Sequence, residues 1–138
     1  MATLAATLGV WSAARPHLLA VSLRANEAQA VADLLEFAEG EDLYRVSGFD
    51  EAGAPDALAD PRRSPLPGQT FVHPRFLWPV RNGYRFVFHA SPFSYVALPA
   101  IPGRTGQRSF LYDAVGRVVH ARSDGLEPRV EDPVVASR

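Results

Sequence analysis

The first 46 residues follow the pattern of one long helix with two unlike halves. Residues 2–14 are small or apolar and uncharged, and Arg15 is the first charged residue. From Asn26 onward, apolar residues recur three and four positions apart, with acidic residues largely between them. The recurring apolar set is Val31, Leu34, Leu35 and Ala38. This spacing predicts a helix over 1–46, apolar over 1–23 and amphipathic over 24–46.

Residues 47–82 show no sustained period and are dense in proline and glycine. Such composition predicts an irregular connection between the helix and the segment that begins at residue 83. A long connection needs apolar contacts to hold it in place. We therefore expect Phe71, Phe76 and Trp78 to anchor this connection to the rest of the domain.

From residue 83 the period changes to two. Large apolar side chains alternate with other residues, which predicts a half-buried strand. The expected inner set is Tyr84, Phe86 and Phe88, and the outer set is Arg85, Val87 and His89. Similar runs at 93–98, 108–112 and 117–121 complete an antiparallel meander over 83–122. Residues 123–138 are rich in proline and acidic residues, and we expect a loose tail.

The expected fold class is therefore α+β, a long N-terminal α-helix packed on a small antiparallel β-sheet. A length of 138 residues fits a single domain. A net charge of −1 and the lack of a polybasic run argue against a nucleic-acid partner. The chain has no cysteine, which excludes disulfides and thiolate metal sites.

Few residues suggest chemistry. The four histidines lack the spacing of metal ligands, although His89 and His120 fall on expected strands. Three acidic residues near the end of the sheet offer oxygen ligands for calcium, namely Asp113, Asp124 and Glu127. Asp113 followed by Gly116 reads more simply as a turn. We predict no metal site and no cofactor.

Acidic residues at helical spacing, Glu36, Glu39 and Asp42, imitate a carboxylate pair, but an exposed charged face explains them more simply. The sequence shows no nucleophile elbow, phosphate loop or dinucleotide motif. No nucleophile, base and orienting group form a recognisable set. We predict no catalytic residues and no enzyme.

The long helix carries a resemblance to a known family. Pro16 precedes Leu18 and Leu19, and it lies ten residues before the sequence Asn26-Glu27-Ala28. This arrangement resembles the N-terminal helix of type IV pilins and type II secretion pseudopilins, in which Pro-Asn-Leu-Leu leads into Asn-Glu-Ala.

The second half of the chain resembles the C-terminal sheet of one pilin-like group. Four short motifs occur in the same order as in that group. They are Gly83-Tyr84-Arg85-Phe86, Ala97-Leu98-Pro99, Thr105-Gly106-Gln107-Arg108-Ser109-Phe110 and Asp113-Ala114-Val115-Gly116 followed by Arg117-Val118-Val119. Each motif is common in meanders, and the ordered set is more specific. The resemblance covers residues 8–46 and 83–120.

The resemblance implies a structural subunit of a type IV pilus or pseudopilus filament, anchored in the inner membrane before assembly. Its partners would be further copies and other pilins, and the filament would be extracellular or periplasmic. Assembly would use the apolar surface of the helix, with small residues allowing close approach. The expected assembly residues are Leu4, Leu8, Val10, Trp11, Pro16, Leu18, Leu19, Val21 and Leu23.

The start typical of this family, a basic leader, a glycine before the cleavage point and an early glutamate, has no counterpart here. The uncharged run at 2–14 is also shorter than the roughly 20 apolar residues that span a bilayer. We therefore expect an N-terminally shortened prepilin-like chain.

An alternative from a different class remains open. The same helix and sheet could form a soluble periplasmic or cytoplasmic domain that binds a small molecule or a protein. In that case the aromatic segment from Phe71 to Trp78 would line the ligand pocket.

Overall fold

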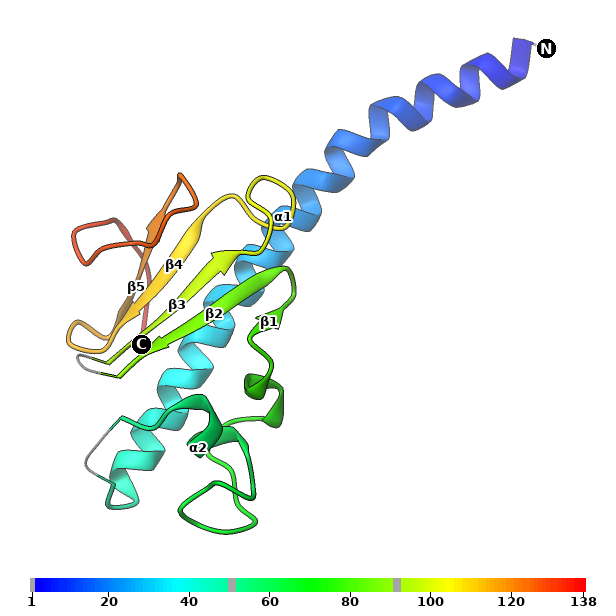
Figure 1. Cartoon of the computed structure of the whole chain (residues 1–138). Helices are drawn as coiled ribbons and strands as arrows, with labels where there is room; N and C mark the ends of the chain where they lie inside the picture. Colours follow the sequence, from blue (N-terminus) through cyan, green and yellow to red (C-terminus); the bar gives the residue numbers. More distant parts are fainter. Residues whose placement is uncertain (1, 50–51, 91–92) are drawn as a thin grey trace.

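The computed structural model describes residues 2–49, 52–90 and 93–138, and the side chains of the first helix from residue 19 onward. One helix leads into a six-stranded sheet, an α+β arrangement (Figure 1). The helices are α1 (Ala2–Val46), α2 (Pro55–Ala59) and the 3-10 turn η1 (Pro74–Leu77). The strands are β1 (Val80–Arg81), β2 (Tyr84–His89), β3 (Ser94–Pro99), β4 (Ser109–Asp113), β5 (Val118–Arg122) and β6 (Val134–Ser137).

The sheet is a simple antiparallel meander. Its strand order is β1-β2-β3-β4-β5-β6, so every strand pairs with its neighbour along the chain. The four strands expected from the two-residue period are β2 to β5. Strand β1 joins β2 through Asn82 and Gly83, whose φ angles of 49° and 77° suit the tight hairpin turn that Asn-Gly favours.

The C-terminal half of α1 packs across one face of this sheet. Leu34 and Phe37 of α1 are fully buried against aromatic residues of the strands. The ring of Phe37 lies 4.3 Å, centroid to centroid, from that of Tyr95 and close to three other aromatic rings. The expected inner set on β2 faces this core, because Tyr84 and Phe86 are buried while Arg85 is exposed.

The connection at 47–82 is more ordered than its composition suggests, because α2, η1 and β1 all lie within it. Phe76 is buried in the main core. Phe71 packs edge-on against Tyr44 near the end of α1. The expectation for Trp78 is wrong, since this side chain is 66% exposed.

The prediction of a loose tail over 123–138 is also wrong. Residues 134–137 form β6, which pairs with β5. The segment before β6 lies against the sheet face that points away from α1. There, Ser109 Oγ donates to the carbonyl of Leu126, and a ring nitrogen of His120 lies 2.8 Å from the carbonyl oxygen of Asp132. This cover explains why Val96 is fully buried on the outer face.

Candidate assembly surface

The N-terminal half of α1 projects well beyond the sheet and the loops (Figure 1). The predicted assembly residues all lie within α1. Leu19 and Val21 are 47% and 50% exposed, and Leu23 is half-buried. The remaining six fall outside the described side chains, namely Leu4, Leu8, Val10, Trp11, Pro16 and Leu18. The helix is continuous through the proline position.

An exposed apolar stripe runs along the face of α1 that points away from the sheet. Val21, Ala25, Ala28 and Ala32 are exposed, and Leu35, which follows at the same spacing, packs partly against the core. Their spacing alternates between four and three residues, which is the spacing of a helix–helix seam. The same spacing continues upstream in the sequence at Leu18, Ala14 and Trp11. Of the predicted assembly residues, Trp11, Leu18 and Val21 fall on this spacing, and the sequence analysis did not extend it along the amphipathic half.

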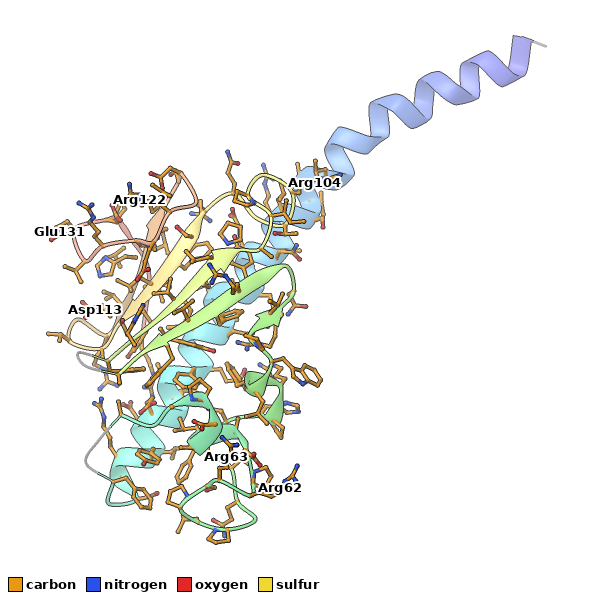
Figure 2. All side chains as sticks on the ribbon, viewed as in Figure 1. Arg62, Arg63, Arg104, Asp113, Arg122 and Glu131 are labelled. Carbon is orange, nitrogen blue, oxygen red and sulfur yellow. The ribbon has the colours of Figure 1, made fainter. Side chains whose placement is uncertain are left out.

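The projecting half meets the sheet domain at a polar collar. The Asn26 side chain donates to the carbonyl of Thr105 at 2.9 Å. Glu27 Oε1 accepts from the backbone nitrogens of Gln107 (3.2 Å) and Arg108 (3.0 Å). Glu27 Oε2 accepts from Nε of Arg108 at 3.1 Å. Figure 2 shows labelled Arg104, in the same β3–β4 loop, beside α1.

Two tight approaches complete this collar. A side chain at Gly106 would overlap the buried ring and hydroxyl of Tyr84, which itself donates to the carbonyl of Arg108 at 2.6 Å. Gly83, at a φ of +77°, lies against Thr105 and Asn26. Three of the motifs that carry the resemblance therefore contact one another at the collar. They are the helix motif that begins at Asn26 and the sheet motifs that begin at Gly83 and Thr105. This meeting fixes the direction in which the projecting half leaves the domain.

Further along α1, a buried ion pair ties the helix to the connection. Asp33 is 1% exposed and accepts from Nε of Arg81 at 3.1 Å and from Nη2 of Arg75 at 3.2 Å. The guanidinium of Arg81 lies over the ring of Phe86, 3.9 Å from its centroid. Asp33 and the two guanidinium groups are paired with one another, so we interpret this cluster as stabilising the packing of α1 on the connection.

The expectation that Glu36, Glu39 and Asp42 form a simple exposed charged face holds only in part, because Glu36 and Asp42 are partly exposed and ion-paired. Glu36 pairs with Arg75, and Asp42 pairs with Arg117 and Arg138. Of the three, Glu39 is the one in the exposed class, and it has no ion pair within the described residues. The acidic residues flank the buried helix face, so they reach arginines on the sheet and the connection.

Glu41 is the unusual carboxylate of α1. It is 1% exposed, and its Oε2 accepts from the backbone nitrogen of Gly53 at 3.0 Å, while Oε1 has no partner within the described residues. Burial raises the pKa of Glu41 from 4.5 to about 7, against the smaller opposing effects of the Gly53 hydrogen bond and the charge of Arg45. Its hydrogen bond to Gly53 places Glu41 under the connection.

The three acidic residues considered as calcium ligands each interact with a different partner. Asp124 pairs with Arg122, and Glu127 pairs with His89. Asp113 accepts from the backbone of Val115 in the turn that the sequence suggested. Across the described parts of the chain, no three His, Cys, Asp or Glu side chains gather as they would around a metal ion.

In the described part of the chain, the cavity that Trp78 borders has no wall from Phe71 or Phe76, its partners in the alternative hypothesis. Phe76 and Phe71 are directed into packing contacts, while Trp78 borders a small cavity of about 250 Å³. The other walls of this cavity come from Arg75, Val80, Arg81 and Asn82, with Arg75 and Arg81 already paired to Asp33.

The chain matches no family model, no curated protein and no solved structure. Within residues 2–49, 52–90 and 93–138, no helix combines the length and the apolar character needed to cross a bilayer. The geometry of α1 is therefore the principal guide to function.

Proposed function

We propose that this chain is a structural subunit of a filament of the type IV pilus or pseudopilus kind, assembled through α1. The observation that carries the proposal is the projecting half of α1 together with its exposed apolar stripe. The exposed part of the stripe runs from Val21 to Ala32, past the point where the sheet domain begins. An uncovered seam of this length favours packing against other helices.

The energetics favour the same interpretation. Apolar surface contributes roughly 25 cal/mol per Å² when it leaves water, and α1 leaves Leu19 and Val21 half in solvent. Small residues at positions 25, 28 and 32 allow helix axes to approach closely. The collar around Glu27 holds the helix in a fixed direction, which a regular assembly needs.

In this proposal the chain is not an enzyme. It is held in the inner membrane before assembly and then joins an extracellular or periplasmic filament with further copies or other pilins. Interfaces of this kind are heterologous and non-closing, so they extend along an axis. The sheet domain then faces outward from a core of helices.

The proposal is tested by electron microscopy of surface-sheared material from cells that express the gene from its native locus. We expect thin filaments that contain this chain. Ala25→Asp and Ala28→Asp place charge in the seam and should abolish the filaments while leaving the sheet domain folded. Ser22→Asp, an exposed position beside the seam, is the matched control and should retain them.

A chain that stays monodisperse and unassociated with membranes, in cells that show no filament containing it, would contradict the proposal. Equal loss of filaments in Ser22→Asp and Ala28→Asp would show that the seam is not the assembly surface.

A further inference from the structure

Trp78 is a large apolar side chain that is exposed to solvent on a hydrogen-bonded backbone. It lies between η1 and β1, is 66% exposed, and is flanked by exposed Leu77 and Val80. Its backbone nitrogen donates to the carbonyl of Arg75 at 3.0 Å, and its carbonyl accepts from Nη1 of Arg81 at 2.6 Å. A tryptophan has only two side-chain torsions, so it loses little entropy on binding, and such residues dominate interface energies. We call Leu77, Trp78 and Val80 the tryptophan knob.

A groove of about 470 Å³ opens on the sheet face that points away from α1. It lies between the β3–β4 region and the segment that returns toward β6. We call it the outer-face groove, and its apolar lining comes from Phe93, Leu111, Val115, Pro128 and Val130. Asp113 and Arg129 supply polar edges. Its volume exceeds that of an indole ring.

The knob and the groove lie on opposite sides of the sheet domain. The knob adjoins β1, the first edge strand, while the groove is bounded by β4 and by the segment between β5 and β6. Figure 1 shows β1 on the right and β5 with the orange and red C-terminal segment on the left. Figure 2 labels Asp113 and Glu131 on that left side. A knob can therefore meet such a groove on another copy, in a heterologous contact that does not close.

The charges around the two surfaces are opposite. Between Pro61 and Tyr112 the sequence has seven arginines and no acidic residue, and four of these arginines, Arg63, Arg75, Arg81 and Arg108, pair with acidic residues from before this segment. One of the seven, the exposed Arg85, is the cross-strand partner of Val80 in the knob. The segment 123–132, which borders the groove, has four acidic residues and one arginine, and beyond Asp124 and Glu127, which pair with Arg122 and His89, it presents Glu131 and Asp132. This complementarity favours a second copy of this chain as the occupant of the groove.

We propose that the tryptophan knob of one copy inserts into the outer-face groove of the next, with Arg85 facing the acidic edge near Asp113 and Glu131. The inference rests on the proposed filament and names a contact between its outward-facing sheet domains. Repetition of this contact links neighbouring domains laterally around the helical core.

Cysteine cross-linking tests the contact directly, because the full chain contains no cysteine. Val80→Cys places a thiol beside Trp78, and Val115→Cys places one at the rim of the groove. Two differently tagged single-cysteine chains are mixed and oxidised, and the heterodimer is quantified. Ile101→Cys, which is 51% exposed against 53% for Val80, is the matched control for surface cysteines.

We expect Val80→Cys to cross-link with Val115→Cys faster than either variant cross-links with itself, and faster than Val80→Cys with Ile101→Cys. Adding Trp78→Ala to Val80→Cys should lower that rate about tenfold or more, as removal of an interface anchor does. Circular dichroism of Trp78→Ala checks that the fold persists. Equal rates for all pairs, or predominant self-linking of Val80→Cys, would overturn the inference.

The same samples separate this inference from the proposed function. Filaments that contain the chain but show no preferred Val80–Val115 cross-link would support the proposed function and contradict the inferred contact between knob and groove. A preferred Val80–Val115 cross-link in a chain that forms no filament in cells would support the contact between knob and groove and contradict the proposed filament.

Discussion

Glu27 accepts hydrogen bonds from both the backbone and the side chain of Arg108, a residue 81 positions away. The backbone nitrogen lies 3.0 Å from Oε1, and the guanidinium Nε lies 3.1 Å from Oε2. Glu27 belongs to α1 and Arg108 to the loop before β4. One carboxylate thus joins the projecting helix to the sheet, and its neighbours Asn26 and Gly106 make the same joint tight.

Replacement of this carboxylate should loosen the collar. Glu27→Gln keeps the shape of the side chain but removes its charge and one acceptor. Because charge-assisted hydrogen bonds to a buried carboxylate are strong, we expect the free energy of unfolding to fall by about 1–3 kcal/mol. Urea denaturation measures the change. Gln107→Ala, which retains the backbone donor, should leave it nearly unchanged, and an equal loss in that control would contradict the assignment.

The buried cluster around Asp33 should be more costly to disturb. Asp33→Ala leaves the guanidinium of Arg81 buried without its carboxylate, so we expect a loss of about 3–5 kcal/mol in the free energy of unfolding. Thermal or urea denaturation checks this value. Glu36→Gln breaks a partly exposed pair to Arg75 and should cost no more than about 1 kcal/mol. Comparable losses in the two variants would show that burial of Asp33 has little effect.

Glu41 should make the fold more stable in mild acid. Its pKa is raised by burial from 4.5 to about 7, so the folded chain binds more protons than the unfolded chain between these values. The free energy of unfolding therefore decreases as pH rises from about 4.5 to about 7 and then levels off, by an amount on the order of 2–3 kcal/mol.

Glu41→Gln removes this titration. Urea denaturation at pH 5 and pH 8 should show a smaller pH dependence for this variant than for the wild-type chain, and a higher stability at pH 8. Glu39→Gln, at an exposed position, is the control that keeps the wild-type profile. If the free energy of unfolding changes with pH in the same way in Glu41→Gln and in the wild-type chain, protonation of Glu41 is not the cause of the pH dependence.

The collar also depends on close backbone approach. Gly106→Ala would place a methyl group onto the buried ring of Tyr84, and such overpacking typically costs about 1–3 kcal/mol. The midpoint of thermal unfolding should fall accordingly. Gly116→Ala would approach only the ends of the Asp113 and Val118 side chains, which can move aside, so it should change stability by about 0.5 kcal/mol or less. Equal shifts of the midpoint in the two variants would contradict the close approach at Tyr84.

Periodic segments were predictable from the sequence because their patterns are local. The alternation from Tyr84 to Phe88 identified β2 and its buried face. Strand β1 was missed because two residues carry no period, although the Asn82-Gly83 pair is a hairpin signal. Strand β6 was missed because the proline and acidic residues before it outweighed the short Val134-Val135 run.

The joints between segments were not predictable in the same way. Nothing near Glu27 in sequence indicates Arg108 as its partner, and nothing near Asp42 indicates Arg138. The exposure of Trp78 was missed for a related reason. Its neighbour Phe76 fills the core, and the backbone of η1 turns the tryptophan outward.

The sequential order of the sheet has a consequence for the order of folding. Every strand pairs with its predecessor, so the meander can close by successive short loops without residues 2–46. By contrast, the bonds of Glu27 to Gln107 and Arg108 span about eighty positions and require the finished sheet. We therefore expect sheet formation to precede docking of α1. A chain whose first helix is held elsewhere during synthesis can still form its strands, and the collar then closes as the last step.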